Sequence, residues 1–523
     1  MIKNISLALP PQIAFEETLL KESIFSHLHL PKDAEAQIRL LRRSIDARGR
    51  NVKINIDAEI YVGEPAKPVL AYSFDYKNVK NASEAIIVGS GPAGLFAALR
   101  LIELGIKPII FERGKDIQSR RRDLAAINKQ HIVNPDSNYC FGEGGAGTYS
   151  DGKLYTRSTK RGDIRRILEI LVNHGAKDEI LIDAHPHIGT NKLPRLVTSL
   201  RETIIEYGGE VHFNSRIMDF IIEDEEMKGV VTQDGIKHTG IGVILATGHS
   251  ARDIFELLYE KKVIIESKPF AMGVRIEHAQ SLIDTIQYHG FPRGEYLPAA
   301  AYSLVCQANY KNAQKGVFSF CMCPGGFIVA AATAPGEVVV NGMSPSKRDS
   351  KYANSGIVVT IGPEDLKQYQ AYGPLAGLQM QRELEQKACM AGGGTQTAPA
   401  QRMIDFVDKK LSSSLLDTSY IPGITSAPLH DVLPEDISAR LRIAFIDFGK
   451  KMKGYYTNDA QMLGVESRTS SPVRVPRDKE TYEHIQIKRI FPCGEGAGYA
   501  GGIVSAAMDG EKCAEMLVER YNG

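Results

Sequence analysis

The 523-residue sequence predicts an α/β fold: a Rossmann-like domain, an inserted sheet-rich α+β domain and a small N-terminal α+β domain. Residues 85–112 read as apolar strand, glycine turn, helix and second strand. A strand and glycine turn recur at 242–248, and strand, glycine loop and helix recur at 489–510. We expect the small N-terminal domain at residues 1–80 and the Rossmann-like domain at residues 81–265 plus 461–523. The inserted domain is expected at residues 266–460.

Composition places the chain among ordinary globular proteins. It is 43% hydrophobic and its formal net charge is +1, so no overall field attracts it to nucleic acid or membrane. The start of the chain has too few apolar residues before Pro10 for a signal peptide, and no apolar run approaches the ~18 residues of a spanning helix. Seven cysteines, an odd number, indicate reduced thiols. We therefore expect a cytoplasmic protein without a membrane partner.

The N-terminal domain is predicted from an alternating apolar pattern. Residues 52–61 alternate as in a half-buried antiparallel strand, 37–44 are the expected partner strand, and 15–28 the expected helix. Residues 77–84 would form the linker. The hairpin is basic through Arg39, Arg42, Arg43, Arg48, Arg50 and Lys53. A solvated sheet face is the favoured interpretation, and contact with RNA is the alternative.

The first glycine motif of the Rossmann-like domain predicts a dinucleotide. Gly89 permits the tight turn after the strand, Gly91 lets the backbone approach a pyrophosphate, and Gly94 lets the following helix pack on the strand. The free N–H groups at the start of that helix favour phosphate. Eighteen positions after Gly94, Glu112 ends the next strand, where its carboxylate can accept hydrogen bonds from ribose. This arrangement predicts bound FAD.

Later segments supply the remaining expected FAD contacts. Residues 210–222 have the pattern of a strand pair beside the adenine, and strand 242–245 ends in a tight turn. Glu495 is placed to bond the ribitol, and the glycines after it open a helix aimed at the flavin. The residues expected to contact FAD are Gly89, Gly91, Pro92, Ala93, Gly94, Glu112, Arg113, Gly145, Gly147, Thr148, Ser150, Asp151, Gly152, Lys153, Ile217, Ala246, Thr247, Gly248, Gly494, Glu495, Gly501, Gly502 and Ile503.

A second glycine cluster, residues 141–154, satisfies the same motif formally. No apolar strand precedes it and no helix with a terminal acid follows, so we do not interpret it as a second nucleotide domain. Its small residues favour a loop whose N–H groups approach the cofactor, delivering Ser150, Asp151 and Lys153. A flexible surface loop is the alternative.

The inserted domain is expected to form a sheet backed by helices that covers the substrate. Expected strands begin near residues 273, 302, 317, 327, 337 and 357, and expected helices span about 363–390 and 434–452. A sheet of this kind over a flavin would form the lid of a pocket.

Residues for chemistry are harder to assign, because hydride transfer belongs to the flavin N5 atom. Candidates are His187 as a general acid, Arg275 as a partner for an anionic substrate, and Cys321 with Cys323 as a redox pair. The C-x-C spacing is tighter than that of most dithiol relays, and buried packing is the alternative role for both cysteines. Other pocket candidates are Arg195, Glu277, His278 and Arg468, and for these four and Arg275 ordinary ion pairing between domains is the alternative. No metal site is expected, since His185 and His187 lack a second ligand pair at zinc-like spacing.

Six motifs resemble the bacterial family of uncharacterised NAD(P)/FAD-dependent dehydrogenases: residues 141–154, 187–193, 273–278, 321–326, 466–474 and 492–503. The resemblance covers nearly the whole chain. It implies an FAD-binding domain of the glutathione-reductase type, a family-specific C-terminal region and oxidoreductase activity. It implies no substrate.

The function expected from the sequence is therefore an FAD-dependent oxidoreductase, a dehydrogenase or reductase. It would exchange a hydride between flavin N5 and an unidentified small molecule under the inserted domain. No second dinucleotide fingerprint follows Gly94, so NAD(P)H would be a transient donor that visits the substrate pocket or delivers electrons through a partner. The alternatives are a flavin-dependent RNA-modifying protein and a non-enzymatic flavin-binding sensor or scaffold. We do not expect nucleic acid as a partner, and the oligomeric state is not predicted.

Overall fold

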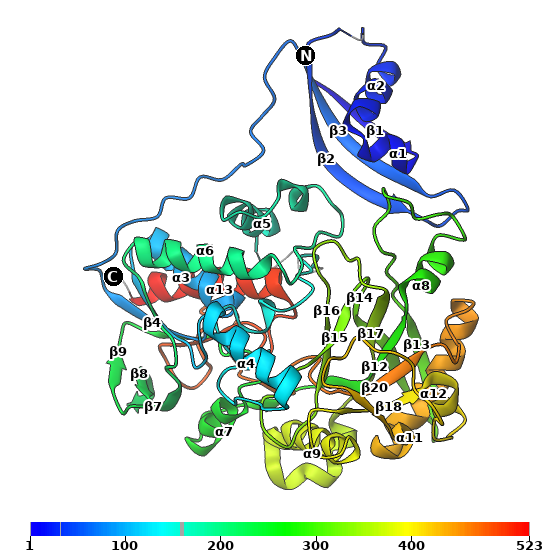
Figure 1. Cartoon of the computed structure of the whole chain (residues 1–523). Coiled ribbons are helices and arrows are strands. Elements are labelled where there is room, and N and C mark those ends of the chain that lie inside the picture. The colour runs from blue at the N-terminus through cyan, green and yellow to red at the C-terminus, as the bar shows by residue number, and fades with distance from the viewer. Residues whose placement is uncertain (1, 32, 157–161, 522–523) are drawn as a thin grey trace.

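The computed structural model describes residues 2–31, 33–156 and 162–521, and the chain forms three sheet-based units (Figure 1). The N-terminal unit projects from the other two. A central unit contains the parallel sheet, and a cap unit contains the largest sheet, which is antiparallel except at one edge pair. Within the described ranges, no helix is both long enough and apolar enough to cross a membrane.

The N-terminal unit is a three-stranded antiparallel sheet of order β1-β3-β2 with two helices. Its elements are β1 (Ile2–Leu9), α1 (Pro11–Phe15), α2 (Glu17–His27), β2 (Ala36–Asp46) and β3 (Lys53–Val62). Both strands predicted here are present, and α2 lies within the predicted helix. Strand β1 was not among the predicted elements, and Leu7 is its one buried residue.

An extended segment, residues 63–83, connects this unit to the central sheet. The backbone N–H groups of Ala71 and Tyr72 donate to the carboxylate of Glu169 at 2.7 and 2.8 Å. Glu169 lies on α5 (Ile164–Asn173). The connection is therefore fastened along the central unit and is longer than the predicted linker.

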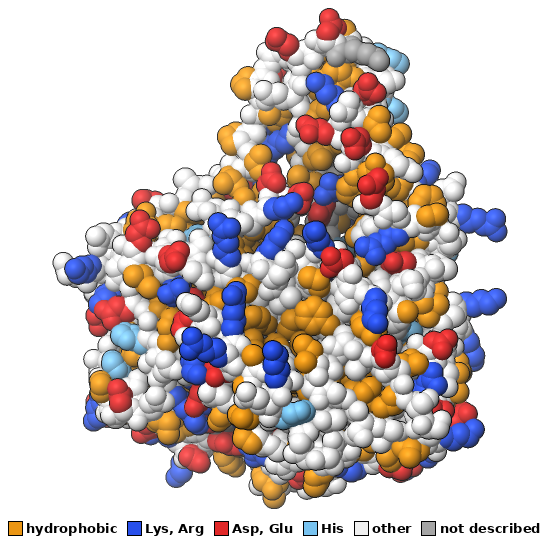
Figure 2. All heavy atoms as spheres, viewed as in Figure 1, with side chains coloured by type: hydrophobic (Ala, Val, Ile, Leu, Met, Phe, Trp, Pro, Cys, Tyr) orange, Lys and Arg blue, Asp and Glu red, His pale blue; other side chains and the backbone are white. Residues whose placement is uncertain are grey.

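Acidic neighbours neutralise half of the basic residues in the N-terminal hairpin. Arg39 pairs with Glu59, Arg43 with Asp183 at 2.8 Å, and Arg48 with Asp46 at 2.6 Å. Figure 2 shows Lys and Arg side chains interspersed with acidic ones around the junction below this unit. The pairing favours a structural role for these arginines.

The central unit is a five-stranded sheet of order β22-β10-β4-β5-β6 in which every pair is parallel. Its strands are β4 (Glu84–Val88), β5 (Lys107–Phe111), β6 (Glu210–His212), β10 (Val243–Leu245) and β22 (Ile490–Pro492). Between β4 and β5 runs α3 (Pro92–Leu104), which packs against α6 (Leu193–Glu206) and α13 (Ile503–Tyr521) (Figure 1). This crossover agrees with the predicted Rossmann-like domain.

The predicted strand pair at residues 210–222 is wrong. Its first strand, β6, continues the parallel sheet beside β5, and the chain then turns at Asn214, which has a φ of 51°. The second strand, β7 (Ile217–Glu223), instead pairs with β8 (Glu226–Thr232), which pairs with β9 (Lys237–Thr239). A turn residue in the left-handed conformation redirects the chain between the two strands.

The cap unit is a seven-stranded sheet of order β13-β14-β17-β12-β20-β18-β19. Its strands are β12 (Phe270–Ala279), β13 (Val305–Tyr310), β14 (Ala313–Cys323), β17 (Tyr352–Ile361), β18 (Ala398–Arg402), β19 (Ile424–Ser426) and β20 (Gln461–Glu466). Because β20 pairs with β12 and β18, this sheet extends one strand past the expected boundary at residue 460. Strands β15 (Phe327–Ala330) and β16 (Val340–Met343) form a separate hairpin.

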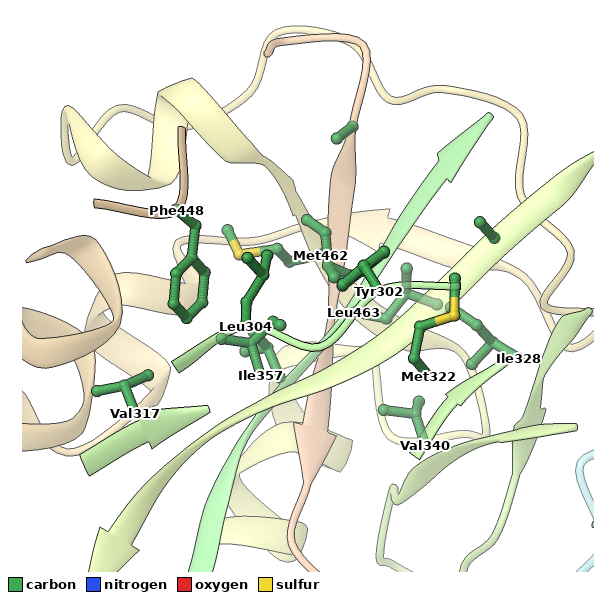
Figure 3. Close-up of a cluster of buried hydrophobic side chains, with 14 of the residues drawn as sticks. Tyr302, Leu304, Val317, Met322, Ile328, Val340, Ile357, Phe448, Met462 and Leu463 are labelled. Carbon is green, nitrogen blue, oxygen red and sulfur yellow. The ribbon is translucent and has the colours of Figure 1, made fainter. Parts of the chain in front are cut away.

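A continuous apolar core joins the cap sheet to its helices, as predicted. Figure 3 shows Met322 of β14 beside Ile328 and Val340, and Phe448 of α12 (Glu435–Lys451) at the other end of the cluster. The remaining helices and strands are α4 (Ile117–Gln130), α7 (Arg252–Glu260), α8 (Gln280–Gln287), α9 (Ala376–Ala391), α10 (Met403–Val407), α11 (Leu429–Val432), β11 (Glu266–Ser267) and β21 (Val473–Arg474).

A buried quartet of two arginines and two glutamates links the central unit to the cap. Arg252 of α7 donates to Glu337 at 3.0 Å and to Glu385 of α9 at 2.7 Å, and Arg468 donates to the same two carboxylates at 3.0 and 2.8 Å. Burial opposes ionisation of Glu385, but the two arginines lower its pKa to about 2. Burial and the neighbouring Glu385 raise the pKa of Glu337.

Glu385→Gln should destabilise the protein strongly, because two buried guanidinium groups lose a shared carboxylate. The expected cost is about 3–5 kcal/mol. Thermal unfolding measures it, and the midpoint should fall by roughly 3–5 °C for a chain of this length. The matched control is Glu383→Gln on the same helix, where the carboxylate bonds only Tyr369 and Gln379 and a much smaller shift is expected. Equal shifts in the two variants would contradict a structural role for the quartet.

Candidate functional site

One cavity of about 610 Å³ lies where the loops of the central unit meet the cap. Almost all of the predicted FAD contacts line it. These are Gly89, Gly91, Pro92, Ala93, Glu112, Arg113, Gly145, Gly147, Ser150, Asp151, Gly152, Lys153, Ile217, Ala246, Thr247, Gly248, Gly494, Glu495, Gly501, Gly502 and Ile503. The structure thus brings together segments that are up to about four hundred residues apart in the chain.

Glycines leave open space along this cavity where a ligand backbone could approach. A Cβ atom added at Gly91, Gly248, Gly501 or Gly502 would meet no protein atom within 4 Å. Gly89 has a φ of 103°, and its added Cβ would lie 2.5 Å from the carbonyl oxygen of Ala246. The turn therefore requires glycine at position 89, whereas position 91 is open to the cavity.

Gly94 does not line the cavity, which corrects its assignment as a cofactor contact. Its added Cβ would lie 2.0 Å from the carbonyl oxygen of Gly89. The residue lets α3 pack closely against the turn after β4, as the motif predicts. It acts on the site only by placing the N-terminus of α3.

Glu112 lines the cavity, but protein donors already engage its carboxylate. One oxygen accepts from the backbone N–H and the hydroxyl of Ser90 at 3.0 and 2.8 Å. The other accepts from the N–H groups of Gly114 and Gly142 at 2.9 and 3.0 Å. These four bonds use the acceptor capacity of a carboxylate. Glu112 therefore joins the two glycine motifs, and its predicted bond to ribose stays a prediction.

The second glycine cluster is an ordered loop held by a buried arginine. Arg120 of α4 is fully buried and donates to the carbonyl oxygens of Asn138, Glu143 and Gly145 at 2.8, 2.9 and 2.9 Å. Thr148 donates to the carbonyl oxygen of Glu143 at 2.8 Å and does not line the cavity, which corrects its predicted contact. These bonds favour the predicted cofactor loop over a flexible surface loop.

Asp151 and Lys153 form a charged corner of the cavity. Asp151 lies 2.9 Å from the Lys153 ammonium and 2.7 Å from the guanidinium of Arg348, which comes from the cap. Burial opposes ionisation of Asp151, but these two cations hold its pKa below the usual value. The corner therefore carries a fixed anion between two cations.

His187 and Arg275 lie outside this cavity, which corrects their expected contact with substrate. His187 lies 3.2 Å from the carbonyl oxygen of Ser346, and burial together with Arg348 lowers its pKa to about 4. Arg275 is completely buried, pairs with Glu466 and donates to Asn354 at 2.8 Å. It therefore serves as a structural ion-pair partner.

The two cysteines of β14 are divided between the cavity and the interior. Cys321 lines the cavity, and the fully buried Cys323 lies behind it. The Nζ atom of Lys153 is 3.9 Å from the sulfur of Cys321 and 3.8 Å from that of Cys323. The structure thus places the candidate cysteines beside a predicted cofactor-loop residue.

Several residues line the cavity without having been predicted, and His249 is one that can carry a proton. It follows Gly248 directly, lies 3.7 Å from Glu495, and burial with nearby Arg468 lowers its pKa to about 4. Its position after the predicted turn was the available signal. Other cavity residues not predicted are Tyr139, Cys140, Phe141, Tyr149, Phe320, Val329, Asn341 and Thr469.

Of the other pocket candidates, one lines the cavity and the rest do not. Arg468 lines the cavity, although its guanidinium is bound within the buried quartet. Glu277 bonds Ser419, and His278 lies 3.0 Å from the carbonyl oxygen of Tyr455 inside the cap. Neither of these residues, nor Arg195, is among those that line the cavity. Glu277 and His278, which were predicted to contact substrate, instead make hydrogen bonds inside the cap.

Across the described part of the chain, one buried group has metal-like ligand spacing: Cys493, Asp509 and Cys513, with ligand atoms within 4.8 Å of one another. The guanidinium of Arg477 donates to both oxygens of Asp509 at 2.5 and 3.0 Å and lies 3.4 Å from the sulfur of Cys513. A guanidinium in this position repels a metal cation. The group is therefore an ion pair, and the predicted lack of a metal stays a prediction.

Comparison with known proteins gives the family. Residues 269–469 match the family described as FAD-dependent protein, C-terminal domain-like, and residues 1–61 match a domain of unknown function. An uncharacterized protein of Clostridium beijerinckii is 40% identical over 542 residues, which cover 100% of this chain and 99% of that protein. The chain belongs to the same family as this Clostridium protein, and its residues 269–469 are similar to the FAD-dependent C-terminal domain. This supports the coarser part of the predicted resemblance.

More distant similarities are weaker. A thiamine thiazole synthase of Aeropyrum pernix is 28% identical over 216 residues, which cover 38% of this chain and 66% of that protein. The flavin-dependent brominase Bmp2 has 13% identity and a TM-score of 0.37, covering 84% of this chain and 80% of its own. Glycine oxidase of Bacillus cereus has 11% identity and a TM-score of 0.30, covering 84% and 95%. We base no conclusion on these similarities.

The residues of the cavity fit the FAD that the family implies. Four glycines open onto the cavity without a neighbouring protein atom, and two helices, α3 and α13, begin at its wall. Helix N-termini carry free N–H groups and partial positive charge that suit a pyrophosphate. The donors and the open space thus agree with a dinucleotide.

Substitution at two glycines of the first motif should separate ligand binding from folding. In Gly91→Ala the new methyl group points into the cavity, so the unfolding midpoint should stay close to that of the unmodified protein. Bound FAD should fall, with affinity roughly tenfold weaker or more, which equals about 1.4 kcal/mol. FAD released from the purified protein and measured by absorbance tests this.

The matched variant is Gly94→Ala, in which the methyl group meets the Gly89 carbonyl oxygen. It should lower the stability of the protein by about 1–3 kcal/mol through overpacking. If Gly91→Ala retained full FAD content, the assignment of Gly91 to the pyrophosphate would be wrong.

Proposed function

We propose that this protein binds FAD in the cavity and is an oxidoreductase that exchanges a hydride between the flavin and a small molecule. The observation that carries the proposal is that one cavity has two different walls. The dinucleotide turn and the start of α13 form one wall, and cap residues form the other. Cofactor and substrate would therefore share a single space.

The central-unit wall would hold the cofactor. The turn at Gly91 and the N-terminus of α3 suit the pyrophosphate, and Glu495 and the N-terminus of α13 suit the ribitol and flavin end. When bound, FAD supplies the hydride acceptor or donor that side chains lack. The neighbouring residues would orient the substrate and keep water away.

The cap wall would hold the substrate. Phe320, Val329 and Ala331 give it an apolar surface, and Asn341 and Thr469 add polar groups. A mostly apolar wall with a few polar groups is typical of small-molecule pockets. His249, with a pKa of about 4, is neutral near neutral pH and could carry a proton at one ring nitrogen beside Glu495.

A nicotinamide is the donor that we propose to test. NAD(P)H would enter the substrate side of the cavity transiently, since the chain has no second dinucleotide fingerprint. We propose a small molecule as the reaction partner and a cytoplasmic location, in line with the composition.

Purified protein should lose its flavin absorption at about 450 nm within seconds when NADH or NADPH is added anaerobically. Loss of this band would support a nicotinamide-linked flavoenzyme and direct the search to electron acceptors. Protein stripped of its flavin is the control for background absorption, and Gly91→Ala should show a smaller change in proportion to its lower FAD content. A flavin that neither nicotinamides nor any of a panel of small-molecule substrates can reduce would contradict the proposed oxidoreductase.

A further inference from the structure

We propose that Cys321 and Cys323 form a redox-active dithiol in the cavity wall and that the substrate it takes is a disulfide. This inference rests on the proposed function and narrows its substrate class. The contacts of the two sulfurs, the backbone of β14 and the difference in exposure of the two thiols support it.

The ammonium group of Lys153 lies close to both thiols. Lys153 Nζ lies 3.9 Å from the sulfur of Cys321 and 3.8 Å from that of Cys323, and the Cys323 thiol donates to the carbonyl oxygen of Cys321 at 3.2 Å. Arg275 adds a guanidinium nitrogen 3.7 Å from the Cys323 sulfur and donates to the Cys321 carbonyl oxygen at 2.7 Å. Lys153 therefore lies beside both sulfurs, and Arg275 lies beside the second of them.

A bulge in β14 places Cys321 at the cavity, with Cys323 behind it. Phe320 pairs with Gly356 and Cys323 with Asn354, so Cys321 and Met322 together oppose one residue, Ser355. Cys321 has a φ of 44°, a left-handed conformation that is rare for cysteine. Met322, between the two cysteines, lies in the apolar core of the cap beside Ile328 and Val340 (Figure 3). Bulges commonly redirect a side chain beside an active site.

The spacing allows a bond between the two sulfurs. Residues two apart in an extended strand have Cα atoms at most about 6.8 Å apart. Disulfides form across Cα separations of about 4.4–6.8 Å. The bulge shortens the strand at this point, so an intramolecular disulfide needs little movement of the backbone.

The two cysteines have unequal electrostatics, which suits separate roles. The hydrogen bond from Cys323 and the charges of Lys153 and Arg275 lower the pKa of Cys321 well below its usual value, although burial opposes this. The bond to Cys321 and burial raise the pKa of Cys323. Cys321 at the cavity is thus the attacking thiolate, and buried Cys323 is the resolving thiol.

The exchange balances in two steps. The Cys321 thiolate attacks one sulfur of a disulfide R–S–S–R′, the S–S bond breaks, and R′–S⁻ leaves. Cys323 then loses its proton and attacks the Cys321 sulfur, which releases R–S⁻ and forms the Cys321–Cys323 disulfide. The substrate has gained two electrons and the dithiol has lost two. Reduced FAD, in the position proposed above, is the two-electron donor that restores the dithiol.

Charged and titratable groups from several elements face this pair. They are Lys153 and Asp151 of the glycine-rich loop, Arg275 of β12, Glu466 of β20, Glu495 after β22, and Tyr302, with Arg348 beside Lys153. Lys153 is the cation closest to both sulfurs that also borders the cavity. It is therefore the residue through which the thiolate can be tested.

Peptide mass analysis of the flavin-containing protein, incubated with glutathione disulfide and then alkylated, tests the exchange. The expected product is a disulfide between Cys321 and Cys323. Cys323→Ser should instead hold glutathione on Cys321, because the resolving thiol is missing, and Cys321→Ser should leave Cys323 unmodified. If Cys321 and Cys323 both stayed reduced in folded, flavin-containing protein, the proposal would be overturned.

Alkylation by iodoacetamide tests the role of Lys153 without any turnover. At about pH 6 the Cys321 thiolate should react at least about tenfold more slowly in Lys153→Met, which corresponds to one pKa unit, and Lys153→Arg should retain most of the rate. Cys389→Ser, at a buried thiol elsewhere in the cap, should leave the rate unchanged. A Cys321 rate insensitive to Lys153→Met would contradict the proposed thiolate.

Flavin reduction tests the proposed oxidoreductase function, whereas thiol–disulfide exchange tests the proposed dithiol. A protein whose flavin is never reduced contradicts the proposed oxidoreductase function. A protein whose flavin is reduced but whose two cysteines never exchange with glutathione disulfide contradicts the dithiol alone. Formation of the Cys321–Cys323 disulfide supports the dithiol, and its reversal by anaerobically reduced flavin supports both.

Discussion

The buried quartet of Arg252, Glu337, Glu385 and Arg468 is the interaction on which the geometry of the cavity depends. Its members come from a helix of the central unit, a loop of the cap, a cap helix and the segment that leads back to the central unit. Charges buried this deeply are tolerated only with good geometry, so the quartet permits few relative positions of cap and central unit. The quartet therefore fixes the position of the cap wall of the cavity relative to the central-unit wall.

A second constraint acts within the central unit itself. Glu112 bonds donors from the first glycine turn and from the start of the second glycine cluster, while Arg120 holds three carbonyl groups of that cluster. Both glycine motifs are therefore parts of one rigid wall. Hydrogen bonds that involve charged groups are the stronger kind, and here they replace regular secondary structure.

Local patterns predicted the parts of the site that local geometry determines. The turn at Gly89, the start of α3 and the glycines before α13 follow from motifs a few residues long, so their place at the cavity could be anticipated. Thr148 and Gly94 were misassigned because a motif does not distinguish a residue that faces a ligand from one that packs behind it. His187 and Arg275 were misplaced for the same reason: their type suggested chemistry, and only tertiary structure shows what they contact. The meeting of Lys153 with Cys321 spans 168 residues and had no signal in the sequence.

The position of β2 in the sheet of the N-terminal unit indicates a role for the basic residues on that strand. Strand β2 lies at an edge, so much of its outer row of backbone groups has no partner strand. At Arg43 the edge is covered by hydrogen bonds with Ile182 and Ala184, and Arg42 is exposed beside it. Charged side chains on an edge strand discourage pairing with a second chain. The arginines of β2 thus help to keep this exposed sheet from templating aggregation.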